Sequence, residues 1–388
     1  MEHPYVSILA RAKLMSIYWL LFAIPAFFAL IGQKRSLKNS RDSYPLNLDP
    51  IWLAIILLFT LVIGLRHHVG GDWYAYLRIY RYVFEHQDTV LGDVVYLAGA
   101  DAGYTVLNWI SAKFNLGIYG VNLMCGLIFS IGLSLFCRNL PRPFLALSIA
   151  VPYLVVVVSM GYSRQAVALG VSMLALVFLS RKQTGWFIFW TIISATFHKS
   201  GIIMLPIAAL SATKNKFTSL FLISIIIGII YYSFLVEPFE LLYKNYIANQ
   251  DSQAQGALIR LMMCVLPALI YLIWPHRFDF KSHERELWSL MSWISLGLLT
   301  MLFLNPNLSI AVDRVALYML PIQLVIFCKV PDMLNNRKIT SQTLTLGVLS
   351  YYFCVLFVWL NFAVNSQDWI PYGNYLLELS HAAYEVID

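Results

Sequence analysis

Charged residues are scarce in this chain: Asp, Glu, Lys and Arg together make up 12% of its 388 residues, about half the share of ~25% in soluble domains. Hydrophobic residues make up 60%, against roughly 45–50% in an ordinary soluble domain. A soluble protein of this length could not bury so much apolar surface, because single cores stop growing with size. The composition therefore excludes a soluble globular enzyme, a disordered chain and a nucleic-acid-binding domain. It predicts an all-α polytopic membrane protein.

Cysteine is also scarce, and the common motifs of soluble enzymes are missing. The five cysteines lie inside apolar runs and form no CxxC pair, so we interpret them as small core residues rather than disulfides or metal ligands. The chain has no DxD, Walker, GxGxxG, GxSxG or HExxH motif. It also has no polar segment long enough for a nucleotide-binding domain. An ATP-driven or nucleotide-sugar-dependent reaction is therefore not indicated.

The apolar runs predict about 11–12 transmembrane helices, since each crossing needs about 20 apolar residues. The run that begins near Leu14 lacks a signal-peptide cleavage site, so we interpret it as a first span. The whole chain, 1–388, is then one transmembrane domain. The predicted spans are 14–32, 51–65, 117–137, 144–160, 165–180, 186–211, 217–236, 261–275, 287–304, 315–328 and 343–362.

The span 186–211 carries a polar group in its middle, His198-Lys199-Ser200-Gly201. Two half-length helices that meet at a polar tip form a broken or re-entrant hairpin, which is tolerated where it is buried in protein. The alternative is one tilted helix with a polar patch. The hairpin places most of the 27 lysines and arginines on the side of loop 33–49, which is then cytoplasmic. The loops 66–103 and 237–259 would then lie outside, and Arg11 and Lys13 would fall on the unfavoured, outer side.

The strongest local pattern follows the second span and runs from Gly64 to Tyr76. Arg66 offers a forked set of donors that suits phosphate, the Gly70-Gly71 pair permits a tight turn, and Asp72 adds a carboxylate. Aromatic rings at Trp73, Tyr74 and Tyr76 offer flat faces for sugars. The alternative is an interfacial aromatic belt with a snorkelling arginine. The pair His67 and His68 lacks a third ligand at a recognisable spacing, so we expect no metal.

Other polar groups lie at the ends of short spans, where an ionisable residue is costly and usually functional. Arg164 occupies a nearly loopless turn, Arg260 follows the loop 237–259, and Arg314 lies beside Asp313 with Tyr318 one turn later. Internal salt bridges and a structural histidine at His198 are the alternatives. We expect Arg66, Arg164 and Arg314 to converge on the outer half of one cavity.

These motifs, in this order, resemble the EpsG-like family of exopolysaccharide and O-antigen polymerases (Wzy type). Gly64-Leu65-Arg66…Gly71-Asp72-Trp73…Tyr76 resembles that family's R-x-x-x-G-x-D-x-x-x-Y region, with one more residue between Arg66 and Gly71. Arg164-Gln165-Ala166 is similar to its R-Q-x-x-A segment. Phe197-His198-Lys199-Ser200 is similar to F-H-x-S, and Arg314 with Tyr318 to R-x-x-x-Y. The likeness covers roughly residues 50–330 and does not identify the sugar.

The resemblance implies a bacterial inner-membrane enzyme that works on the periplasmic side without metal, nucleotide or other cofactor. It would transfer the growing glycan, carried on undecaprenyl pyrophosphate, onto a new lipid-linked repeat unit. A chain-length regulator of the polysaccharide co-polymerase type is then an expected partner. An O-antigen ligase and a transporter or flippase of lipid-linked oligosaccharide are the alternatives.

The roles expected from the side chains divide into three groups. Arg66, Arg164, Arg260 and Arg314 would bind the pyrophosphate, and Trp73, Tyr74, Tyr76 and Tyr318 would bind sugar. His198 would be the base, because an unperturbed histidine pKa of ~6.5 leaves it mostly neutral and able to accept a proton. Asp72 is the rival catalytic residue, but Arg66 beside it would lower its pKa and make it a weaker base.

Overall fold

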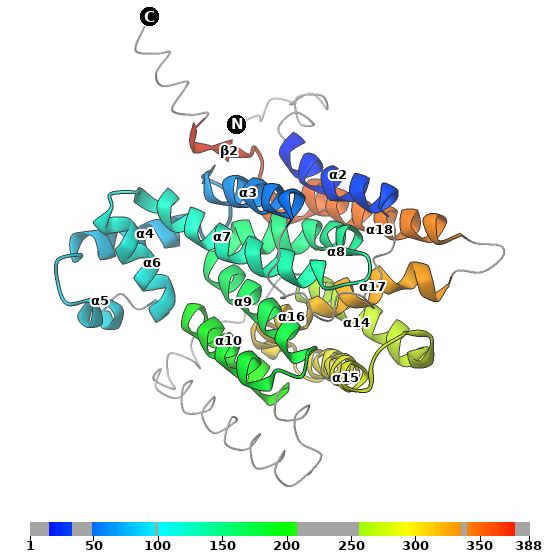
Figure 1. Cartoon of the computed structure of the whole chain (residues 1–388). Helices are drawn as coiled ribbons and strands as arrows, with labels where there is room; N and C mark the ends of the chain where they lie inside the picture. Colours follow the sequence, from blue (N-terminus) through cyan, green and yellow to red (C-terminus); the bar gives the residue numbers. More distant parts are fainter. Residues whose placement is uncertain (1–14, 33–48, 98–99, 208–255, 335–339, 377–388) are drawn as a thin grey trace, which may run out of the picture.

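The computed structural model describes residues 15–32, 49–97, 100–207, 256–334 and 340–376 (Figure 1). The elements up to residue 207 are α2 (Ser16–Ile31), α3 (Pro50–Gly64), β1 (Arg66–His67), α4 (Trp73–Glu85), α5 (Leu91–Leu97), α6 (Ala102–Lys113), α7 (Gly117–Arg138), α8 (Pro143–Ala150), the π-helix η2 (Val151–Ser159), α9 (Ser163–Leu179), α10 (Thr184–Phe197) and the 3-10 helix η3 (Lys199–Met204). The later elements are α14 (Ala257–Ile273), η6 (Pro275–Arg277), α15 (Ser282–Leu304), η7 (Pro306–Leu308), α16 (Ser309–Met319), α17 (Pro321–Met333), α18 (Ser341–Phe362), η8 (Val364–Asp368) and β2 (Gly373–Asn374).

Membrane-spanning helices dominate this part of the chain. Among the described residues, α7, α15 and α18 are each long and apolar enough to cross a membrane. A fourth span is formed if α16 and α17 are taken together, and shorter apolar helices coincide with most of the other predicted spans. The all-α, multi-pass fold is therefore confirmed. The predicted span 217–236 and most of the loop 237–259 lie outside the described residues.

The predicted span 315–328 is not one straight helix. The segments Pro306–Met319 and Pro321–Met333 meet at an angle of 46°. Pro321 is the first residue of α17, a position where a helix does not need the backbone N–H that proline lacks. Because Pro321 cannot donate a hydrogen bond to a carbonyl of α16, the two helices do not continue as one. This bend was not predicted, because the hydropathy of the run is continuous across it.

The helix predicted from residue 186 is interrupted, as expected, at its polar tip. Helix α10 ends at Phe197, and His198 has an extended backbone with φ −157° and ψ 124°. The chain then turns back on α10, so that a Cβ placed on Gly201 would lie 2.5 Å from Oγ of Ser194. The remainder of the predicted hairpin, from residue 208, lies outside the described residues.

A π-helix, η2, continues α8 for nine residues. Single-turn π-bulges are the usual form, frequently at functional sites, so a segment of this length is uncommon. Its widened turns leave the carbonyl of Val156 to accept a hydrogen bond of 2.8 Å from the indole N–H of Trp369, which is buried. Gly161 makes room for that ring, since a Cβ there would lie 2.6 Å from it.

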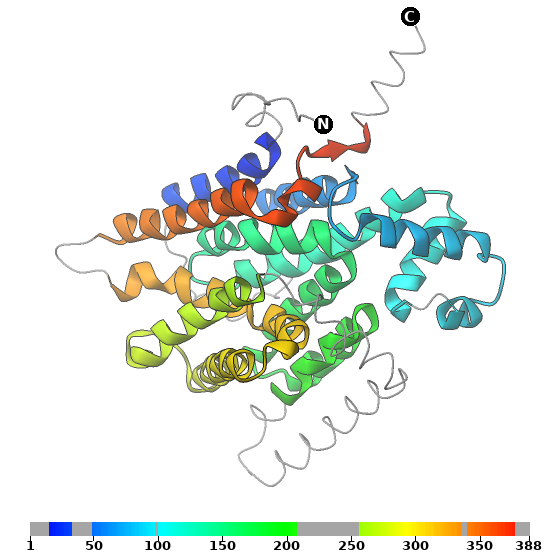
Figure 2. The same ribbon diagram turned by 180° about the vertical axis from the view of Figure 1, so that it is seen from behind.

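The centre of the bundle is the crossing of α7 and α9, seen in the middle of Figure 1. Gly132 and Gly170 lie against each other, and a Cβ on Gly132 would overlap the carbonyl oxygen of Gly170. Small residues let membrane helices approach closely and pack by van der Waals contact. Seen from behind in Figure 2, α18 (orange), α14 (yellow-green) and α15 (yellow) cover the other side of the bundle.

The segment 66–103 is largely helical, not an extended loop. Helices α4, α5 and α6 gather at one end of the bundle, past the end of α3 (Figure 1). Strand β1 pairs antiparallel with β2, with Arg66 opposite Asn374. The C-terminal segment is thereby held at the same end of the bundle as this group of helices.

All five cysteines are free thiols. Four of them are buried, as expected for small core residues, whereas Cys354 lies on the exposed face of α18.

Candidate active site

A polar cavity of about 410 Å³ lies where α4, η2, α9, α14 and α16 meet, beyond the end of α10. It brings together residues that are far apart in the sequence. Six residues of the predicted site line it: Asp72, Tyr76, Arg164, His198, Arg260 and Arg314. The other lining residues are Tyr153, Tyr162, Gln165, Ile310, Asp313, Leu317 and Asn365.

Arg164, in the first turn of α9, is held by a carboxylate that the sequence analysis did not identify. Its Nη1 lies 3.0 Å from Oδ2 of Asp101, whose side chain is only 8% exposed. The other oxygen of Asp101 accepts a hydrogen bond of 3.3 Å from the backbone N–H of Lys199. Asp101 therefore connects α9 to the tip that follows α10. The guanidinium of Arg164 also lies over the ring of Tyr76, 6.0 Å from its centroid, a cation–π geometry.

Two further arginines reach the cavity from its other side. Arg260, in the first turn of α14, donates from Nε to Oδ1 of Asp313 at 2.5 Å, and both side chains are 21% exposed. These residues are 53 positions apart, so the ion pair joins α14 to α16. Arg314, the residue after Asp313, also lines the cavity. Three guanidinium groups therefore face one cavity in a largely apolar protein, where ionisable side chains usually mark a functional site.

Asp72 is the carboxylate at the start of α4. Its Oδ2 accepts a hydrogen bond of 3.3 Å from the hydroxyl of Tyr76. Burial raises the pKa of Asp72, while the positive charges of Arg164 and Arg314 act in the opposite direction. Arg66 does not contribute, so the expectation that Arg66 lowers the pKa of Asp72 is wrong. A raised pKa makes the ionised Asp72 a stronger base than a solvent-exposed aspartate.

His198 follows the last residue of α10 and lies at the cavity. Its Nδ1 accepts a hydrogen bond of 3.3 Å from the backbone N–H of Ser200, and Oγ of Ser200 lies 2.5 Å from the same nitrogen. Nδ1 therefore bonds within the protein, and Nε2 is the ring nitrogen left for the cavity. Burial, aided by Arg314 and Arg164, lowers the pKa of His198 to about 3. The expectation of an unperturbed pKa near neutrality is therefore wrong, and the lowered pKa makes the ring a weak base.

Arg66 does not line the cavity, contrary to the expected convergence. It is 1% exposed and donates from Nη2 to Oδ1 of Asn122 at 3.2 Å and to Oγ of Ser163 at 2.7 Å. Its other donors meet the carbonyls of Ile63 and Val69. With its donors used within the protein, Arg66 holds the start of α9 in place, one residue before Arg164.

Three of the four aromatic residues predicted to bind sugar lie off the cavity, and only Tyr76 lines it. Trp73 is buried, whereas Tyr74 is 60% exposed and contacts His68. Tyr318 is buried, and its hydroxyl accepts a hydrogen bond of 3.2 Å from Oγ of Ser200. Tyr318 therefore supports the tip that carries His198.

Some residues that line the cavity were not predicted from the sequence. Tyr153 lies in the π-helix, inside an apolar run. Asn365 follows α18 and begins the polar stretch Asn365-Ser366-Gln367-Asp368, which was not included in the predicted site. Asp101 lies in the segment 66–103 and directly precedes α6. Its position before a helix was the only feature in the sequence that could have drawn attention to it. Tyr162 and Gln165 flank Arg164 and could have been added to the site on that ground. Within the described residues no group of three His, Cys, Asp or Glu side chains could hold a metal ion.

The fold and the cavity define a multi-pass membrane protein with a polar, arginine-lined site among its helices. Residues 50–374 match the EpsG family, and the chain belongs to that family. Membership indicates a membrane protein similar to the polysaccharide polymerases and is consistent with a glycosyltransferase-like activity. No curated protein and no solved structure matches the chain.

Proposed function

We propose that the protein is a Wzy-type polysaccharide polymerase of the bacterial inner membrane, with its cavity on the periplasmic side. It would transfer a growing glycan from undecaprenyl pyrophosphate onto a new lipid-linked repeat unit. The observation that carries the proposal is the cavity that combines Arg164, Arg260 and Arg314 with the carboxylate of Asp72. A chain-length regulator of the co-polymerase type remains a proposed partner.

The reaction joins two lipid-linked substrates. A hydroxyl oxygen of the new repeat unit attacks the anomeric carbon of the growing glycan. The bond from that carbon to the pyrophosphate breaks, and the pyrophosphate leaves with the electron pair. The acceptor hydroxyl loses its proton in the same step. The site therefore needs a group that stabilises the negative charge on the pyrophosphate and a group that accepts the proton.

The arginines meet the negative charge. Positioned donors that face the site where charge develops are usually the largest contribution to catalysis. Arg164 and Arg260 are each held by an ion pair, with Asp101 and with Asp313, so their guanidinium groups are oriented before the substrate arrives. Orientation in advance removes the reorganisation that water would require.

Asp72 is the better candidate for the base. Its raised pKa brings it closer to the pH at which a general base is most effective. His198 is the poorer candidate, because burial lowers its pKa to about 3 and makes the ring a weak base. We assign His198 a substrate-binding role through Nε2, since Nδ1 bonds to Ser200. The roles expected from the sequence are thus exchanged.

The test uses purified protein in lipid nanodiscs with a lipid-linked repeat unit as the only substrate. Product length and released undecaprenyl pyrophosphate are measured. Changing Arg164, Arg260 or Arg314 to Ala should lower turnover by about 10²–10³-fold, the cost of one charge-stabilising donor. Lysine at the same position should restore only part, because it lacks the planar fork. The control is Arg81→Ala on the exposed face of α4; full activity in all three cavity variants would refute the proposal.

A deletion strain separates this function from the two alternatives in a host that makes lipopolysaccharide. Loss of a polymerase leaves core with a single repeat unit, whereas loss of a ligase leaves bare core. Loss of a flippase leaves no periplasmic repeat unit. We expect the first pattern, and either of the others would assign the protein to that alternative class.

A further inference from the structure

Tyr153 is the residue through which the π-helix η2 reaches the active-site cavity. Its side chain is 6% exposed, so most of the ring is packed among the surrounding helices. Among the described residues its hydroxyl has no hydrogen-bond partner. A buried hydroxyl without a partner is unusual and costly. Because Tyr153 lines the cavity, a ligand that occupies the cavity can supply the missing partner.

The π-helix explains how Tyr153 comes to this cavity. Tyr162, nine positions later and directly before α9, lines it too. In an α-helix nine residues make about two and a half turns, so residues 153 and 162 would lie on opposite faces. The i→i+5 hydrogen bonds of a π-helix place more residues in each turn and change this phase. Two tyrosines from one continuous segment therefore line one cavity.

Tyr153 lies near the ion pair of Arg260 and Asp313. Both charges are close enough to act on its hydroxyl electrostatically. Arg260 is one of the arginines that we assign to the pyrophosphate, and Asp313 fixes its orientation at 2.5 Å. In a lipid-linked substrate the first sugar is bonded directly to the pyrophosphate. A hydroxyl beside Arg260 therefore faces that sugar when the pyrophosphate is bound.

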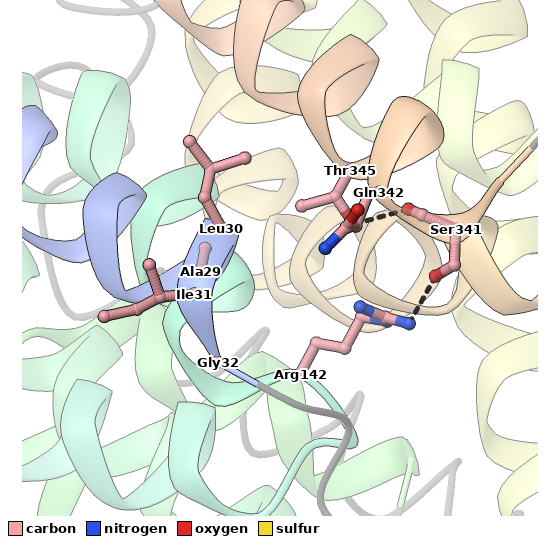
Figure 3. Close-up of a pocket in the computed structure, with 8 residues that line it drawn as sticks. All are labelled: Ala29, Leu30, Ile31, Gly32, Arg142, Ser341, Gln342 and Thr345. Atoms are coloured by element: carbon pink, nitrogen blue, oxygen red, sulfur yellow. Dashed lines mark hydrogen bonds between the residues drawn. The ribbon is translucent and has the colours of Figure 1, made fainter.

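A second cavity, of about 290 Å³ between α2 and α18, lacks this feature (Figure 3). Nη2 of Arg142 lies 2.8 Å from Oδ1 of Asp332 and donates to Oγ of Ser341 at 2.6 Å. The hydroxyl of Thr345 donates to the carbonyl of Ser341 at 2.8 Å. These polar groups bind within the protein, so the second cavity gives no comparable indication of a ligand.

We propose that Tyr153 is a specificity-determining residue whose hydroxyl binds a hydroxyl group of the sugar attached to the pyrophosphate. This inference rests on the proposed polymerase function and names the part of the growing glycan that this side of the cavity recognises. A tyrosine hydroxyl both donates and accepts, and so does a sugar hydroxyl. A site that hydrogen-bonds a substrate hydroxyl rejects the analogue that lacks it, because the buried protein group is then left unpaired. Tyr153 therefore selects for a free hydroxyl at one position of the first sugar.

The test measures turnover in nanodiscs with lipid-linked repeat units whose first sugar lacks one hydroxyl at a time. For the unchanged protein, one of these deoxy substrates should have a kcat/KM at least about tenfold below that of the complete substrate. Tyr153→Phe should lower kcat/KM for the complete substrate about 3–10-fold, the contribution of one hydrogen bond between uncharged groups. It should then use that deoxy substrate as well as the complete one, a change of selectivity that a merely structural role would not produce.

The matched control is Tyr104→Phe, because Tyr104 is 0% exposed and does not line the cavity. This variant should keep both the turnover and the selectivity of the unchanged protein. Tyr153→Phe should fold, since the packed ring stays in place and the lost hydroxyl has no hydrogen-bond partner among the described residues.

The outcomes separate this inference from the proposed function. If the unchanged protein does not turn over the complete substrate, the polymerase function fails and the inference fails with it. Normal turnover without selectivity among the deoxy substrates would overturn the inference alone. Selectivity that Tyr153→Phe retains would also overturn it, because another residue would then recognise the sugar.

Discussion

The backbone N–H of Ser200 donates to Nδ1 of His198 at 3.3 Å, and this bond determines which ring nitrogen is available to the cavity. Because Nδ1 also lies 2.5 Å from Oγ of Ser200, Nε2 is the ring nitrogen left for substrate. The hydroxyl of the same serine donates to Tyr318 at 3.2 Å, which fixes the tip of the turn against α16. A short polar sequence after α10 therefore holds the His198 ring in one orientation at the cavity.

The first prediction follows from this exchange of roles. His198→Gln should keep turnover within about tenfold of the unchanged protein, because a glutamine amide can also hydrogen-bond a substrate oxygen. Asp72→Asn should lower turnover by about 10²–10⁴-fold, the usual contribution of a general base. Turnover is measured in nanodiscs with purified lipid-linked repeat units. If His198→Gln is inactive while Asp72→Asn is active, His198 is the base.

The second prediction concerns the pH dependence of turnover. Burial raises the pKa of Asp72 above its usual value, so the base is protonated and turnover falls as the pH drops through that raised value. His198, with a pKa of about 3, remains neutral between pH 5 and 8. The acid limb should therefore be unchanged in His198→Gln. A limb that disappears in this variant would contradict the assignment of Asp72.

The third prediction concerns Arg66, which we interpret as a structural residue. Arg66→Ala leaves the oxygens of Asn122 and Ser163 without their donor in a buried site, and each lost hydrogen bond in a membrane protein costs about 0.6–1.7 kcal/mol. The thermal unfolding temperature in detergent should fall, and folded protein should lose activity because Ser163 precedes Arg164. If stability is unchanged and only substrate affinity falls, Arg66 binds substrate.

The fourth prediction uses two glycines in membrane-spanning helices. Gly132→Ala places a Cβ onto the backbone of Gly170 and should separate α7 from α9, with loss of folded protein after purification. Gly347→Ala is the matched control, because nothing lies within 4 Å of a Cβ built at that position on α18. The yield of monodisperse protein by size-exclusion chromatography is the measurement. Equal yields would show that the α7–α9 contact is not required.

The sequence by itself determined the fold class and the family, and for the same reason. Hydropathy along the chain predicts where α7, α15 and α18 cross the membrane, because each crossing depends on a continuous run of residues. The ordered motifs around Arg66, Arg164 and His198 are also local, and they indicated the EpsG family. Six of the predicted site residues then met in one cavity, because polar residues at span ends gather where the helices end.

Only the tertiary structure decided which of these residues face the cavity. Arg66 and Arg164 look equivalent in the sequence. The residues that bind the Arg66 side chain away from the cavity, Asn122 and Ser163, lie 56 and 97 positions along the chain. Asp313 pairs with Arg260 across 53 positions, a contact that no local pattern predicts. Burial, and with it the pKa of Asp72, depends on packing among helices that no local pattern records. The number of hydrogen-bond partners around a charged group is a property of the folded bundle.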